Sequence, residues 1–159
     1  MTRPALVLQH GPLGPAGLLG AVAGGWLADR VGRTALTTGA LAVSGACCLL
    51  SPLAFAAPAA VLVALLAVWG AAVIADSAQF SAAATELAEP RYAGSALTLQ
   101  VALGFALTIV SIRLVPVVVD AAGWRWAFLP LALGPAAGAV AMLRLRGLPE
   151  AAAMAGGRR

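Results

Sequence analysis

Long apolar stretches with very few charges constrain the fold of this chain more than any other feature. Five of them run over residues 5–28, 35–56, 59–88, 95–119 and 124–143. A helix needs about 20 mostly apolar residues to cross a bilayer, and each stretch reaches that length. Hydrophobic residues make up 62% of the 159 positions and charged residues 10%, so too little polar material is present to cover a soluble domain. The sequence therefore predicts a protein whose solvent is lipid.

Only helices and closed barrels satisfy all their backbone hydrogen bonds inside a bilayer. The apolar stretches lack the alternation of apolar and polar residues that barrel strands show. We therefore expect an all-α membrane protein, with a bundle of about five transmembrane helices within residues 1–147 and a polar cytoplasmic tail at 148–159. Arg113 and Pro116 should interrupt the fourth stretch near its far end, because proline removes a backbone donor.

Arginine placement predicts the orientation of the bundle. The chain has ten arginines, no lysine and six acidic residues. Seven arginines belong to turns or the tail on one side of the expected bundle: Arg30, Arg33, Arg91, Arg144, Arg146, Arg158 and Arg159. The opposite side has Arg3 and Arg125. Because cytoplasmic loops are enriched in arginine, we expect a plasma-membrane protein with its N-terminus outside and its C-terminus in the cytoplasm.

Several other classes of protein are disfavoured by the composition. The basic residues are not clustered among exposed aromatic residues, so we expect no nucleic-acid partner. His10 is the single histidine and has no Cys, Asp or Glu near it in the sequence, so no metal site or cofactor is expected. No acid pair and no Ser/His or Cys/His arrangement suggests an enzyme.

A charged loop separates the first two apolar stretches and reads Gly25-Trp26-Leu27-Ala28-Asp29-Arg30-Val31-Gly32-Arg33. Its spacing resembles the signature loop of the major facilitator superfamily (MFS). Residues 86–131 are also similar to that family, through Pro90-Arg91-Tyr92-Ala93-Gly94 and Gly123-Trp124-Arg125-Trp126-Ala127-Phe128. The resemblance implies part of a carrier whose two six-helix bundles flank a central cavity, with alternating access.

Five helices with an external N-terminus resemble helices 8 to 12 of that family, or helices 2 to 6. We favour helices 8 to 12, because residues 102–116 lack the Gly-Pro pattern common in the fifth helix, and residues 59–88 lack the arginine often found in the fourth. The quality of the loop match favours helices 2 to 6 instead, since this loop is usually degraded in the second half.

The resemblance implies a conformational-switch loop made of Gly25, Asp29, Arg30, Gly32 and Arg33. Gly25 would permit close approach of a neighbouring helix. Asp29 would then lie near the positive N-terminus of that helix. Gly32 would let the chain turn sharply.

Opposite charge would allow Arg30 and Arg33 to pair with Glu86 or Glu89. The resemblance implies that such a charge network is a latch that holds the cytoplasmic side closed and breaks as the two bundles rock apart. The simpler interpretation is a plain cytoplasmic turn whose arginines only set the topology.

A second candidate site contains Asp76, Ser77, Gln79 and Ser81. An acidic residue inside an apolar helix usually faces a cavity, a partner or a proton route. Asp76, Gln79 and Glu86 share one helical face, with the two serines beside it, so these side chains form a candidate substrate or proton site. The alternative is that Asp76 is hydrated near the cytoplasmic interface.

Together these features predict membrane transport of an unknown small solute by alternating access, with proton coupling as one option. The missing part of a carrier, or a second copy of this chain, would be the partner within the bilayer. The alternative is a truncated, non-transporting remnant of such a carrier, or an interaction partner of another membrane protein. The odd number of expected helices favours that alternative.

Overall fold

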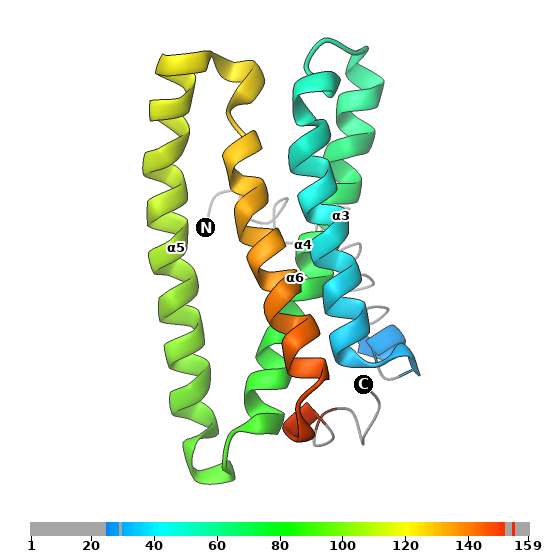
Figure 1. Ribbon diagram of the computed structural model, residues 1–159, viewed down its shortest axis with the longest axis vertical. Coiled ribbons are helices and arrows are strands. Elements are labelled where there is room, and N and C mark those ends of the chain that lie inside the picture. The colour runs from blue at the N-terminus through cyan, green and yellow to red at the C-terminus, as the bar shows by residue number, and fades with distance from the viewer. Residues whose placement is uncertain (1–24, 29, 152–153, 155–159) are drawn as a thin grey trace, which may run out of the picture.

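The computed structural model describes residues 25–28, 30–151 and 154, and these form an upright group of helices (Figure 1). The long helices are α3 (Arg33–Ala54), α4 (Ala59–Leu87), α5 (Ala93–Ala122) and α6 (Leu133–Arg146). Three short 3-10 helices, η1 (Pro90–Tyr92), η2 (Trp124–Trp126) and η3 (Leu129–Ala132), lie in the connections. Of the described residues, 91% are helical and none lies in a strand.

Four spans in the described part of the chain are long and apolar enough to cross a membrane. They are Arg33–Ala54, Ala59–Leu87, Pro90–Ala122 and Trp124–Arg146. The expected all-α architecture is therefore confirmed, and the chain has the features of an integral membrane protein. The first expected span, residues 5–28, lies outside the described residues except for 25–28, which are helical.

The expected interruption of the fourth span is wrong. Helix α5 continues without a break past Arg113 and Pro116 to Ala122, and ends at Gly123, which has a positive φ of 88°. A break within lipid would leave further backbone groups without a hydrogen-bond partner, so continuing the helix through a single proline costs less.

The last span is less regular than the single helix expected over residues 124–143. It begins with η2 and η3, and α-helical geometry starts only at Leu133. Pro130 has no N–H, and Leu131 donates instead to the Phe128 carbonyl, three residues back, at 3.2 Å. The tighter 3-10 pattern is therefore the local consequence of this proline.

Helix α3 packs against both α4 and α6 (Figure 1). Toward α6 the contact is through small residues, with Leu41 of α3 facing Gly138. A Cβ atom added at Gly138 would lie 3.2 Å from the Leu41 Cδ1 atom, and one added at Gly45 would lie 3.5 Å from the Pro135 Cβ atom. Because lipid gives helices no hydrophobic drive to associate, this close approach supplies van der Waals attraction in its place.

Toward α4 the contact of α3 includes a polar link. The Trp69 indole N–H donates to the Ser44 hydroxyl oxygen at 3.0 Å, and Ser44 is buried. The Trp69 ring also meets Phe128 edge to face, with centroids 5.6 Å apart. Trp69 therefore connects α3 and α4 to the start of the last span.

Pro52 lies inside α3 without ending it. Because proline has no N–H, the Cys48 carbonyl loses its helical donor, and the Ser51 hydroxyl donates to that carbonyl at 2.7 Å. The Arg125 Nε donates to the Pro52 carbonyl at 3.1 Å. These bonds stabilise the last turn of α3 and attach η2 to it.

Helix α5 differs from the other helices because none of its residues is buried in the described structure. Its large apolar side chains are exposed along its length, with Phe105 and Leu107 among the most exposed at 67% and 68%. In Figure 1 it stands at the edge of the group. Lipid or other protein must cover this helix in the membrane.

The tight contact at Gly138 gives a testable difference between two glycines of α6. Gly138→Leu should lower the free energy of unfolding by roughly 1–3 kcal/mol, because the new side chain overpacks Leu41. Gly134→Leu is the matched control, since a Cβ at Gly134 meets nothing within 4 Å. Dodecyl sulfate titration followed by circular dichroism measures both variants, and equal losses would contradict the packing described.

Candidate functional site

Positive charge gathers at one end of the bundle, which we name the arginine end. Helix α3 begins there, and α4 and α6 end there, at the bottom of Figure 1. The arginine end contains Arg30, Arg33, Arg91, Arg144 and Arg146 among the described residues. Arg125 lies at the opposite end, in η2. The asymmetry expected from the sequence is therefore present in the folded chain.

The turn before α3 depends on Gly32. Residues 25–28 and 30–31 are helical, and Gly32 then adopts a φ of 99°, which side chains rarely allow. Its N–H donates to the Ala28 carbonyl at 2.9 Å, and its own carbonyl accepts from Leu36 at 3.1 Å. Gly32 thus joins two helical segments and directs Arg33, the first residue of α3, toward α4.

Gly25 and Asp29 are the other two residues of this loop for which the sequence predicts a contact with a neighbouring helix. A Cβ atom at Gly25 would meet nothing within 4 Å, so the expected close approach of a helix is not seen there among the described residues. Asp29 lies outside the described residues.

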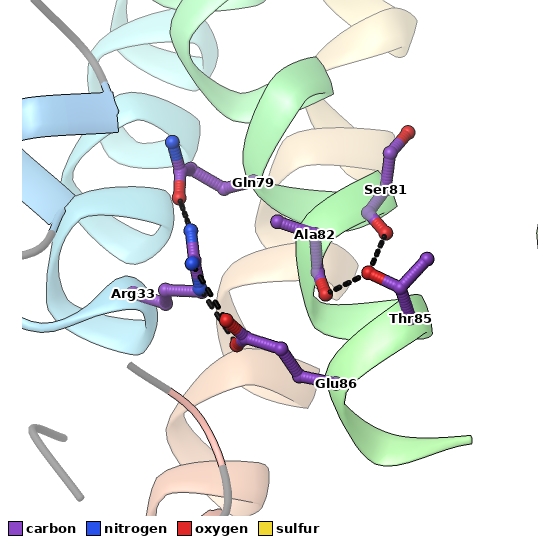
Figure 2. Close-up of polar contacts among 6 residues, drawn as sticks. All are labelled: Arg33, Gln79, Ser81, Ala82, Thr85 and Glu86. Atoms are coloured by element: carbon purple, nitrogen blue, oxygen red, sulfur yellow. Dashed lines mark hydrogen bonds and ion pairs between the residues drawn. The ribbon is translucent and has the colours of Figure 1, made fainter. Parts of the chain in front are cut away.

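Arg33 makes the central contact of the site, with two residues of α4 (Figure 2). Its Nε donates to Glu86 Oε2 at 2.7 Å and its Nη2 to Glu86 Oε1 at 2.7 Å. Its Nη1 donates to the Gln79 side-chain oxygen at 2.9 Å. The planar guanidinium thus lies between Gln79 and Glu86, which are seven residues, or two helical turns, apart on one face of α4.

Burial makes this contact stronger than a surface ion pair. The side chains of Arg33 and Glu86 are 14% and 28% exposed, and Gln79 is 1% exposed. Charge-assisted bidentate hydrogen bonds are short and directional. Water and salt screen the attraction in a part-buried ion pair less than in an exposed one. The Arg33 contact therefore fixes the start of α3 against the end of α4.

The remaining charged residues predicted for the latch lie elsewhere. Arg30 stacks on the Trp26 ring, with its guanidinium carbon 3.8 Å from the ring centroid. Glu89 accepts from Arg91 Nε at 2.9 Å, and both side chains are largely exposed. Such an exposed pair contributes little to stability.

The candidate substrate or proton site is not one cluster. Gln79 faces α3 and binds Arg33, whereas Ser81 lies on the other side of α4 (Figure 2). The Ser81 hydroxyl points back to its own helix and reaches the Ser77 carbonyl at 3.5 Å. Asp76 is half-buried and Ser77 is exposed. A groove of about 450 Å³ between α3 and α4 is lined by apolar side chains, Ala75 among them.

Sequence reasoning assigned Gln79 to a cavity and missed its contact with Arg33. The signal was present, because positions 79 and 86 lie on one helical face and the arginine begins the neighbouring helix. Sequence reasoning also gave no role to Ala151 and Met154, which are buried although they belong to the expected polar tail.

No group of three metal-ligating side chains exists within the described residues. The chain matches no protein-family model, no curated protein and no solved structure. Any function must therefore be argued from the residues themselves.

Because the Arg33 contact is part-buried, we expect Glu86 to contribute more to the free energy of unfolding than Glu89, which lies at the same end of the bundle. Glu86→Gln should lower the free energy of unfolding by roughly 2 kcal/mol, because it removes the acceptor charge from a part-buried arginine. Glu89→Gln, in the exposed pair with Arg91, is the matched control and should leave the unfolding transition unchanged. The measurement is the same detergent titration, and a larger effect at Glu89 would contradict the assignment.

Proposed function

We propose that the chain is part of a facilitator-type carrier that moves a small solute across the plasma membrane by alternating access. The supporting observation is that the loop resembling the family's signature ends in Arg33, and that Arg33 binds Glu86 and Gln79 across the α3–α4 contact. A plain topogenic turn needs arginines facing water, and does not need a part-buried, bidentate partner.

In this proposal the Arg33 contact is the latch. Ion pairs of this kind have two discrete states, made and broken, and therefore suit an element that alternates between conformations. The latch is made in the conformation described, with the ends of α3 and α4 held together. Both helices belong to one bundle of such a carrier, so the latch would break when α3 moves against α4 within that bundle. That movement would separate Arg33 from Glu86 and expose both charges to water, which compensates part of the lost attraction.

Asp76 is the residue we assign to the solute or to a coupling proton. It lies ten residues before Glu86, about 15 Å deeper along α4, within the apolar span. A carboxyl group at that depth is costly unless it faces a cavity, a partner or a proton route. Gln79 belongs instead to the latch, because its side-chain oxygen is already occupied by Arg33.

We propose that the arginine end faces the cytoplasm, which places the N-terminus outside and the C-terminus inside. Five of the described arginines lie at this end, and Arg125 lies at the other. The positive-inside rule favours this orientation.

The second candidate function is that of a non-transporting remnant or an interaction partner of another membrane protein. The observation that favours it is α5, which has no buried residue and is therefore not enclosed by the described helices. In that case α5 would be covered by the partner, and Asp76 would have no transport role.

Transport itself is tested in proteoliposomes with a labelled sugar, amino acid, organic anion and organic cation under an imposed proton gradient. We expect uptake of one class, with at least a tenfold loss in Asp76→Asn and unchanged uptake in Glu89→Gln. A version of the chain extended upstream is assayed beside it. Uptake by the extended version alone assigns transport to the longer protein, and no uptake by either supports the remnant.

Orientation is tested with single cysteines in a Cys47→Ala, Cys48→Ala background. An impermeant maleimide should label Trp124→Cys in intact cells, and Tyr92→Cys and Leu148→Cys only after permeabilisation. All three positions are exposed in the structure. Labelling of positions 92 and 148 from opposite faces would overturn the topology, and the reversed pattern would overturn its orientation.

A further inference from the structure

The chain turns back on itself after α6. Gly147 and Leu148 donate their N–H groups to the carbonyls of Arg144 and Leu145, each at 3.0 Å, and Ala151 donates to Leu148 at 3.2 Å. These successive three-residue bonds form tight turns at the arginine end of the bundle. Residues 147–151 therefore stay close to the end of α6.

Two apolar residues that follow α6 are fully buried. Ala151 and Met154 have 0% exposure, and they pack with Ala83 of α4 and with the partly buried Leu145 of α6. We name Ala83, Leu145, Ala151 and Met154 the C-terminal cluster. Among the described residues, Met154 is one of the largest side chains that is fully buried. Such complete burial stands out in a chain whose other apolar side chains are mostly exposed.

The C-terminal cluster acts on the same part of α4 as Arg33 does. Ala83 follows Gln79 by four residues and precedes Glu86 by three, so the three lie on one helical face. The last turns of α4 are thus held from α3 by an ion pair and from the C-terminal cluster by an apolar contact. Neither contact shares an atom with the other.

We propose that Ala151 and Met154 form an apolar strap after α6, which holds the last turns of α4 and is coupled to the Arg33–Glu86 contact. Both contacts favour the same position of α4, so loss of either one weakens the other. Burial of Met154 stabilises the strap, and the entropy lost in ordering Ala151 and Met154 opposes it. The proposal holds whether or not the chain transports a solute.

The test uses the full chain in nanodiscs, with Cys47→Ala and Cys48→Ala as background, and follows the rate of maleimide labelling. Met154→Cys should react at least tenfold more slowly than Leu148→Cys, which is on the same segment but 48% exposed. Adding Glu86→Gln should raise the rate at position 154 several-fold and leave position 148 unchanged. Glu89→Gln is the matched control and should change neither rate.

A reverse measurement covers the case in which Glu86→Gln does not give a folded, monodisperse preparation. Met154→Asn should raise hydrogen exchange across residues 79–87 several-fold, whereas Leu148→Asn should leave it unchanged. Equal labelling at positions 154 and 148 would overturn the docked strap. A labelling rate at position 154 that does not respond to Glu86→Gln in a folded sample, or unchanged exchange in Met154→Asn, would overturn the coupling.

Discussion

A part-buried arginine at the start of a membrane helix needs a carboxylate within reach, and this requirement organises the arginine end of the chain. Arg33 uses its guanidinium to bind Glu86 through two bonds and Gln79 through a third. An arginine left without an acceptor at 14% exposure would be strongly destabilising, so α4 must present its acidic face to α3. The relative position of these two helices follows from that requirement.

The rest of the bundle is held by weaker and more distributed contacts. Leu41 packs into the space beside Gly138, and Trp69 donates to Ser44 within the apolar region. Lipid competes well with apolar side chains for such surfaces, so these contacts depend on close fit and on hydrogen bonds. Helix α5 has neither kind of contact along most of its length, which explains why it buries no residue in the described structure.

The sequence predicted those features that depend on local composition. Apolar length located α3, α4 and α5 within a few residues, and arginine placement indicated which helix ends lie together. Proline effects were harder to predict, because their outcome depends on which groups replace the lost hydrogen bonds. The Ser51 hydroxyl replaces one at Pro52, whereas Pro130 leads to 3-10 geometry.

The side-chain contacts were only partly accessible from the sequence. Helical periodicity placed Gln79 and Glu86 on one face, but it did not say whether that face met a cavity or another helix. The burial of Met154 depends on a turn after α6 that brings this residue to α4, and no local sequence pattern predicts such a turn. For both Gln79 and Met154, predicting the contact would have required the position of the helix against which the residue packs.

The account depends most directly on Arg33 and Glu86 acting as a pair, and a charge exchange tests this. The free energy of unfolding is measured for Arg33→Glu, Glu86→Arg and the double variant. We expect each single variant to be destabilised and the double variant to recover much of the loss, because the opposite charges again face each other. If the losses of the two single variants simply add in the double variant, Arg33 and Glu86 do not form the contact on which this account rests.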